Sequence, residues 1–281
     1  MRIMQPCPRL QPHNTLKLKD GPVCIRRAVL GLRGPRCVAG GRVSAATVIA
    51  AAFVVCRVCL STGPARAGDD GAHFLLFSGA DLWRDGRFMH GGLLWSPGGI
   101  DGEGFTLEAM VSGGTYRYAS SALNNALVIG ADEEAQVLPG WRFKRDRLEL
   151  KVFAGLDIKN DIPSPYDPSN RLHGTSVGIR GAVNLWFEPP PATMVAADAW
   201  LTSIANGYSA RAAYGWRLRD WFYLGPEAQT LACIGYSQLR FGLHLTGLKT
   251  EQWEWPAAAG WANDSDGRSS PYLRLGLLTR R

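Results

Sequence analysis

Apolar and polar residues alternate in many segments of the chain after residue 67. In the clearest segment, Leu148 to Ile158, every second side chain is Leu, Val, Ala or Ile, and Glu149, Lys151 and Asp157 lie between them. Successive side chains of a β-strand point to opposite faces. The pattern therefore predicts a strand with one apolar and one polar face.

About twelve segments of this kind follow one another, and no helical period lasts longer than a turn or two. Short strands at this spacing predict an all-β fold, an antiparallel up-and-down transmembrane β-barrel with lipid outside and water inside. Ten or fourteen strands remain open, because residues 104–143 can be divided in more than one way. The twelve predicted strands are 73–84, 86–96, 104–118, 128–143, 147–158, 173–187, 193–205, 208–218, 221–235, 239–248, 254–262 and 270–279.

The joints between these strands differ in length. The two longest run from Ala119 to Leu127 and from Lys159 to Leu172. The second contains Asn160–Asn170, which is so rich in turn-forming residues that we predict no strand there. If both chain termini lie in the periplasm, both of these joints fall on the outside of the cell.

Charged residues on the polar faces are expected to point into the barrel, since arginine at the lipid midplane costs about 2–4 kcal/mol. Arg180, Arg211 and Arg274 should therefore face the lumen. Both signs of charge share this phase, which predicts a mixed-charge lumen that acts structurally. The residues predicted to face the lumen are Glu149, Lys151, Asp157, Arg180, Asn184, Arg211, Arg217, His244 and Arg274.

Tryptophan and tyrosine cluster near the predicted strand ends. This placement is typical of the aromatic girdles with which membrane barrels meet the lipid interfaces. A platform that stacks sugars is the alternative. The aromatic residues concerned are Trp83, Trp95, Tyr116, Tyr118, Trp141, Trp186, Trp216, Trp221, Tyr223, Trp253 and Trp255.

The first 67 residues have the features of an export signal. They hold eleven of the 31 Lys and Arg residues but one of the 24 acidic residues, which leaves 20 basic and 23 acidic residues in the remainder. A small, apolar run from Ser44 to Leu60, interrupted by Arg57, precedes Ala65-Arg66-Ala67, a small-x-small pattern that signal peptidase cuts after. A membrane anchor is the alternative, but the run is short for a bilayer span.

We therefore divide the chain into an export signal, residues 1–67, and one barrel domain, residues 68–281. Because the positive charge belongs to the leader, we expect no nucleic-acid partner.

No group of residues has the pattern of a catalytic, metal or cofactor site. His173 and Ser176 would be the pair of a barrel-wall hydrolase, but at a spacing of three they point to opposite faces of a regular strand. Asp264 and Asp266 supply only half the spacing of a calcium-binding loop. We therefore expect no enzyme activity, no cofactor and no metal.

Four motifs that combine glycine with aromatic residues carry a resemblance to a known family. They are Phe77–Trp83, Val137–Phe143, Val152–Asp157 and Tyr223–Gln229. With them the chain resembles the cellulose biosynthesis BcsS family over about residues 74 to 280. Those proteins are exported, barrel-like proteins of alphaproteobacteria that are associated with cellulose synthase operons.

The resemblance implies a non-enzymatic outer-membrane protein that supports cellulose biosynthesis, export or surface assembly. Its implied partners are outer-membrane lipid, cellulose or a related glucan, and components of the cellulose synthase complex. The alternatives are an envelope-modifying hydrolase similar to lipid A deacylases, and a purely structural barrel. If a glucan passes through the lumen, the expected contacts are the rings of Phe153, Trp186 and Tyr272 and the three lumenal arginines; simple packing of these side chains is the alternative.

Overall fold

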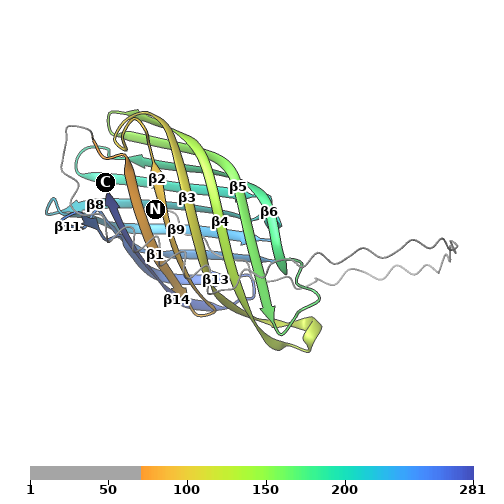
Figure 1. The fold of residues 1–281 in the computed structure, drawn as a ribbon. Coiled ribbons are helices and arrows are strands. Elements are labelled where there is room, and N and C mark those ends of the chain that lie inside the picture. Colours follow the sequence, from red (N-terminus) through yellow and green to blue (C-terminus); the bar gives the residue numbers. More distant parts are fainter. Residues whose placement is uncertain (1–70) are drawn as a thin grey trace, which may run out of the picture.

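A computed structural model describes residues 71–281, and the predicted export signal lies outside them. Twelve long strands form a closed barrel (Figure 1), and a short hairpin and two 3₁₀ turns, η1 (Ser121–Leu123) and η2 (Ile204–Asn206), lie in its joints. The strands are β1 (Phe74–Trp83), β2 (Gly86–Trp95), β3 (Gly104–Ser120), β4 (Ala126–Arg145), β5 (Leu148–Ser164), β6 (Gly174–Phe187), β7 (Thr193–Thr202), β8 (Tyr208–Leu218), β9 (Phe222–Cys233), β10 (Tyr236–Thr246), β11 (Lys249–Thr250), β12 (Trp253–Glu254), β13 (Ala257–Asp264) and β14 (Ser269–Arg280).

The barrel closes between its first and last strands. Each long strand pairs antiparallel with the next, and β1 pairs with β14 from Leu75 opposite Arg280 to Trp83 opposite Tyr272. The hairpin of β11 and β12 extends the sheet beside the end of β14. Closure leaves neither the first nor the last strand with an unpaired edge. The prediction of a twelve-stranded, up-and-down antiparallel barrel is confirmed.

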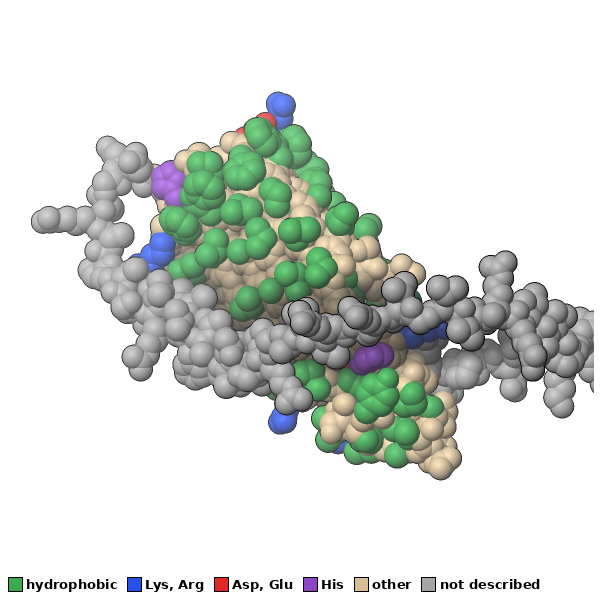
Figure 2. Space-filling model, turned by 45° about the vertical axis from the view of Figure 1, so that its right-hand side comes forward, with side chains coloured by type: hydrophobic (Ala, Val, Ile, Leu, Met, Phe, Trp, Pro, Cys, Tyr) green, Lys and Arg blue, Asp and Glu red, His purple; other side chains and the backbone are tan. Residues whose placement is uncertain are grey.

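The outer surface of the barrel is apolar. On β5 the even-numbered side chains from Leu148 to Ile158 point outward, and Leu156 is 60% exposed. Figure 2 shows hydrophobic side chains spread over the visible wall, with the charged groups near its margins. Burying such a surface in water-free lipid is favourable, so the wall has the chemistry of an outer-membrane-type barrel.

An aromatic girdle surrounds the end of the barrel that carries both chain termini, called the terminal end from here on. The outward side chains of Trp95, Phe105, Trp141 and Trp216 lie there, and Phe105, Trp141 and Trp216 are exposed. The girdle prediction is wrong for other residues. Trp83, Tyr116, Tyr118, Trp186 and Tyr223 are on the inner phase of their strands, because position along a strand does not decide which face a side chain occupies.

The strand β5 continues beyond its predicted end at residue 158. It runs to Ser164, so the prediction that residues 160–170 contain no strand is wrong. Residues as far as Asp161 still pair with β6, whereas Pro163 pairs only with Gly130 of β4. Proline is tolerated on such a strand edge because no partner there needs its missing N–H.

One wall of the barrel is taller than the rest. The strands β3, β4 and β5 have 17, 20 and 17 residues, whereas β7 and β13 have 10 and 8. The excess lies at the end opposite the termini, where η1 caps the β3–β4 connection (Figure 1). Long joints are not confined to that end, because the terminal end carries the joints 96–103 and 247–256.

No helix within residues 71–281 is long and apolar enough to cross a membrane.

Candidate functional site

The interior of the barrel is divided into a packed polar core and a cavity that opens at the terminal end. The core is held by ion pairs between neighbouring strands and between strands two or three places apart in the sheet. The cavity, called the vestibule, lies between this core and the ring of joints at the terminal end. Both parts are built from side chains on the inner phase of the strands.

Arg180 of β6 organises the first half of the core. Its guanidinium donates to Asp157 of β5 at 3.0 and 2.8 Å and also contacts Glu134 of β4. Thr202 of β7 donates a further hydrogen bond to Asp157 at 2.8 Å. Paired and hydrogen-bonded in this way, the buried charges avoid the large cost of isolated ions. We call these four residues the Arg180 cluster.

Arg240 of β10 organises the second half. One of its nitrogens lies 3.0 Å from both carboxylate oxygens of Asp81 of β1, and its guanidinium stands 4.9 Å from the ring centre of Tyr272 and 5.1 Å from that of Trp83. Tyr272 in turn donates to Glu227 at 2.9 Å. The contacts fix β1, β9, β10 and β14 to one another across the lumen.

Aromatic and aliphatic side chains fill the space around these ion pairs. Tyr116 donates to Asp161 at 2.6 and 2.8 Å, and its ring covers Gly130 so closely that a Cβ there would come within 2.2 Å of it. Phe153 packs with Leu94 and Leu138. A small cavity of about 20 Å³ remains beside the Arg180 cluster, which is room for about one water molecule. The core therefore closes the lumen in this conformation.

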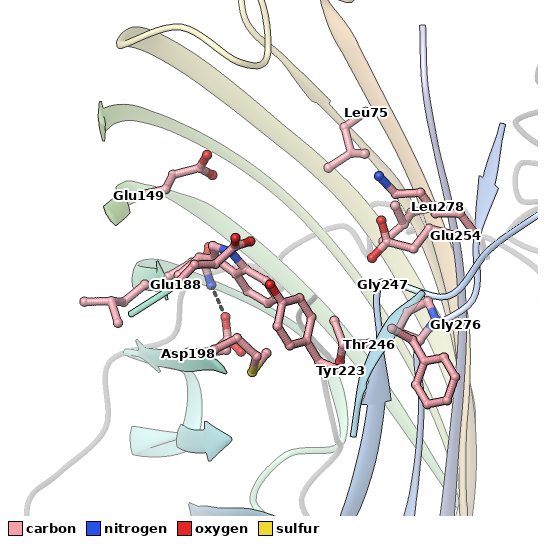
Figure 3. Close-up of a pocket in the computed structure, with 18 of the residues that line it drawn as sticks. Leu75, Glu149, Glu188, Asp198, Tyr223, Thr246, Gly247, Glu254, Gly276 and Leu278 are labelled. Carbon is pink, nitrogen blue, oxygen red and sulfur yellow. Dashed lines mark hydrogen bonds between the residues drawn. The ribbon is translucent and has the colours of Figure 1, made fainter. Parts of the chain in front are cut away.

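The vestibule has a volume of about 630 Å³. Glu188, Asp198 and Tyr223 lie on one of its walls, and Leu278 and Glu254 face them from the other (Figure 3). Ligand pockets usually measure about 300–1,000 Å³, so the space suits a small ligand or the end of a longer one. Its inner end is bounded by Asp198, Arg211 and Arg274, where the core begins.

Several charged side chains on the wall of the vestibule are paired with one another. Lys151 lies 2.6 Å from Glu149, and Arg211 lies 3.0 Å from Asp198. Asn184 donates to the same Asp198 at 2.9 Å. The lining residues include nearly as many acidic as basic side chains, so the cavity offers little net charge to a ligand.

The residues predicted to face the lumen all lie on the inner phase of their strands. Phe153, Tyr272 and Arg180 are enclosed in the core, and Arg211, Arg274 and Trp186 line the vestibule. Contact of these six with a glucan stays a prediction. Arg217 differs from the other predicted lumen residues, because it sits at the rim, with 36% of its side chain exposed.

Several interior residues were missed at the level of sequence. Asp81, Glu134, Lys159, Glu227 and Arg240 carry much of the core, and none was singled out for the lumen. The signal that could have found them is the same alternation. Each stands on the polar phase of a strand whose other face is apolar, as Arg240 does between Leu239 and Phe241.

His173 and Ser176 do not form the catalytic pair that the hydrolase alternative would need. His173 lies in the joint between β5 and β6, where its Nδ1 is 2.9 Å from the backbone oxygen of Asn170 and its ring packs edge-on to Tyr166. Ser176 lies on the inner phase of β6. Within the part of the chain that the structure describes, no hydrogen bond is found between them.

The acidic cluster at the β13–β14 joint is occupied by its own arginine. Arg268 lies 3.0 Å from Asp264 and 2.6 Å from Asp266. Across residues 71–281, no group of three or more His, Cys, Asp or Glu side chains is arranged to hold a metal ion.

Comparisons with known proteins find several similar chains of known structure. The chain is similar to the COG4313 outer membrane channel from Pseudomonas putida F1, with 10% identity, a TM-score of 0.49, and coverage of 77% of this chain and 100% of that chain. It is also similar to the translocator domain of autotransporter NalP from Neisseria meningitidis, with 13% identity, a TM-score of 0.45, and coverage of 84% and 97%. It is similar as well to the KdgM porin, with 13% identity, a TM-score of 0.42, and coverage of 73% of this chain and 98% of that chain.

The search of curated proteins finds no match. A family model described as cellulose biosynthesis protein BcsS matches residues 75–281. This match spans nearly the whole barrel, and the chain therefore belongs to the cellulose biosynthesis protein BcsS family.

Proposed function

We propose that this protein is a non-enzymatic component of the outer membrane that supports the assembly of cellulose at the cell surface. Membership of the BcsS family supports the link to cellulose biosynthesis. The observation that carries the choice of role is the closed core. A lumen crossed by the Arg180 cluster and the Arg240–Asp81 pair favours binding and organisation over free passage of a chain.

The proposed orientation places the terminal end in the periplasm. Bacterial barrels with an even number of strands carry both termini on that side. The vestibule would then open toward the compartment that a newly made glucan crosses. Residues 1–67 would direct the chain through the inner membrane and be removed after Ala67.

The alternative of an envelope-modifying hydrolase would need an activated nucleophile. A serine is activated by a base within hydrogen-bond reach. The ring nitrogen of His173 is instead directed to the carbonyl of Asn170. A purely structural barrel is the remaining alternative, and it differs from our proposal in predicting no effect on cellulose.

A deletion strain complemented with variants tests the proposal. We expect the deletion to lower dye-accessible cellulose on intact cells while isolated membranes keep their cellulose synthase activity, because the protein acts after polymerisation. The double variant His173→Ala, Ser176→Ala should restore surface cellulose as well as wild type does. Unchanged surface cellulose in the deletion strain would remove the assembly role. Failure of the double variant at normal protein level would instead favour the hydrolase.

A further inference from the structure

We propose that the vestibule is a binding site for a segment of neutral β-linked glucan, with Trp186 as the ring on which a sugar stacks. The inference rests on the proposed function for the identity of the glucan. It rests on the cavity itself for the class of ligand: an uncharged chain rich in hydroxyl groups. Three features of the vestibule carry it, namely charge balance, a fixed aromatic ring and a closed inner end.

The charge balance argues against an ionic ligand. Glu149 is paired with Lys151, Glu188 with Arg217 at 3.4 Å, and Asp198 with Arg211. At these pairs, a phosphate or a carboxylate would have to displace an acidic partner, and a cation a basic partner. A neutral ligand can instead accept and donate hydrogen bonds at the edges of such pairs without breaking them.

Trp186 is held in place from two sides. Its indole N–H donates to Glu188 at 2.9 Å, and Tyr223 meets it edge-on with ring centres 6.0 Å apart and an interplanar angle of 79°. The indole is only partly buried and lines the cavity. A rigid ring with one wet side offers apolar contact area at little cost in conformational entropy. The C–H face of a glucose ring presents a matching apolar surface.

Hydrogen-bonding groups lie around this ring. Asn184 and Asp198 form a hydrogen-bonded pair on neighbouring strands, and Thr246 lies beside Tyr223, its partner on the adjacent strand.

The closed inner end sets the mode of binding. Asp198, Arg211 and Arg274 bound the vestibule on the inside, so a glucan would enter from the terminal end and stop there. The site would hold a chain end or a short loop of chain. This mode fits a protein that retains or orients a polymer, and it differs from threading through a pore.

Binding of cellohexaose to the full mature barrel in detergent tests the inference. Titration calorimetry would be run beside maltohexaose, an α-linked glucan, and an oligogalacturonate, which carries charge. We expect cellohexaose to bind more tightly than either control. Trp186→Ala should raise the Kd about tenfold or more, the factor that about 1.4 kcal/mol of lost contact produces. Trp186→Phe should have a smaller effect, because it keeps a ring in place.

Trp216→Ala is the matched control. It removes a tryptophan at the same end of the barrel, but one that points outward and is 52% exposed, so cellohexaose binding should not change. Heat-modifiable gel mobility shows for each variant that the barrel is folded. If Trp186→Ala does not fold, the comparison of Trp186→Phe with wild type decides.

The site is overturned if the wild-type barrel does not bind cellohexaose, if folded Trp186 variants bind it as wild type does, or if oligogalacturonate binds equally well. These results are separable from those of the deletion strain. Loss of surface cellulose on deletion without cellohexaose binding leaves the assembly role and removes this site. If the barrel binds cellohexaose but the deletion does not change surface cellulose, the assembly role is removed and the glucan-binding site stands.

Discussion

At the scale of single residues, the barrel depends on charges that are fully enclosed. The side chains of Arg240 and Asp81 have no exposed surface, and they join strands whose positions differ by 159 residues in the chain. Removing one partner of a buried ion pair costs about 3–5 kcal/mol, because the other charge stays buried alone, whereas replacing both by apolar side chains of similar size is often neutral. We therefore expect the pair to add little net stability, and its loss on one side to be costly.

We expect Asp81→Leu to lower the free energy of unfolding by about 3–5 kcal/mol, since it leaves Arg240 without its carboxylate. The double variant Asp81→Leu, Arg240→Met should recover most of that loss. Urea unfolding in lipid vesicles, followed by tryptophan fluorescence, measures both. A single variant as stable as wild type would contradict the structural role of this pair.

At the scale of elements, β5 combines three environments along one strand. Its outward side chains are apolar from Leu148 to Ile158, and then Asn160 joins Glu133 and Thr175 in a polar row on the outer surface. Beyond that row the strand belongs to the taller wall. The change from apolar to polar marks where the lipid layer is expected to end.

Arginine placed at two positions of β5 should therefore have different costs. Ala154→Arg lies in the middle of the apolar stretch and should destabilise the barrel by about 2–4 kcal/mol, whereas Asn160→Arg on the same face should cost about 0–1 kcal/mol. The measurement is the free energy of unfolding in lipid vesicles. Equal costs at the two positions would mean that the polar row does not mark the interface.

The joint between β5 and β6 is tied down by one carboxylate. Asp167 accepts hydrogen bonds from Tyr118 at 3.0 Å and from the backbone and hydroxyl of Ser169 at 3.0 and 2.9 Å. Burial alone would raise the pKa of this carboxyl, but these bonds and one with Ser120 outweigh burial and hold the pKa below its ordinary value.

Because the pKa of Asp167 is lowered in the folded protein, its carboxylate stabilises the joint at any pH above the ordinary Asp pKa of about 4. This contribution is lost as the pH falls through the pKa of Asp167 in the folded protein. We expect the hydrogen-exchange protection factors of residues 165–173, which are corrected for the intrinsic pH dependence of exchange, to stay high at pH 7 and pH 5 and to fall in more acidic solution. Asp167→Asn should lower these protection factors at every pH. Protection factors in wild type that do not depend on pH would contradict this role of Asp167.

The sequence predicts the strands better than it predicts which side chains contact one another inside the barrel. Alternation is a local signal, so the outward phase of β5 could be read directly from Leu148 to Ile158. The contacts of Asp81 with Arg240 and of Trp186 with Tyr223 join strands three places apart in the closed sheet, and no local pattern encodes that. The extension of β5 past residue 158 was missed because Pro163 indicates a loop unless the edge beside it is known to be free.

At the scale of the whole molecule, two groups of side-chain contacts in the core link strands that are not neighbours in the sheet. The Arg180 cluster joins β4 to β7, and Arg240 and Glu227 join β1, β9, β10 and β14. A barrel of about this strand number can be filled by its own side chains, and this one is filled over the part beyond the vestibule.

The purified barrel should therefore show no steady open-channel conductance in planar bilayers. The physical reason is that ions would have to cross a packed layer of paired charges and rings. Single-channel recording at moderate voltage, with a porin as the positive control, makes the test. A stable conductance of porin size would show that the core opens in the membrane.

The taller wall formed by β3, β4 and β5 has a consequence for what meets the cell from outside. With the termini in the periplasm, the tip at η1 stands farther from the bilayer than the short turn between β7 and β8. The barrel then extends farther from the membrane on the side of β3, β4 and β5 than on the opposite side. An antibody or a bacteriophage that approaches through a coat of surface sugars reaches that side first, and the low side stays screened.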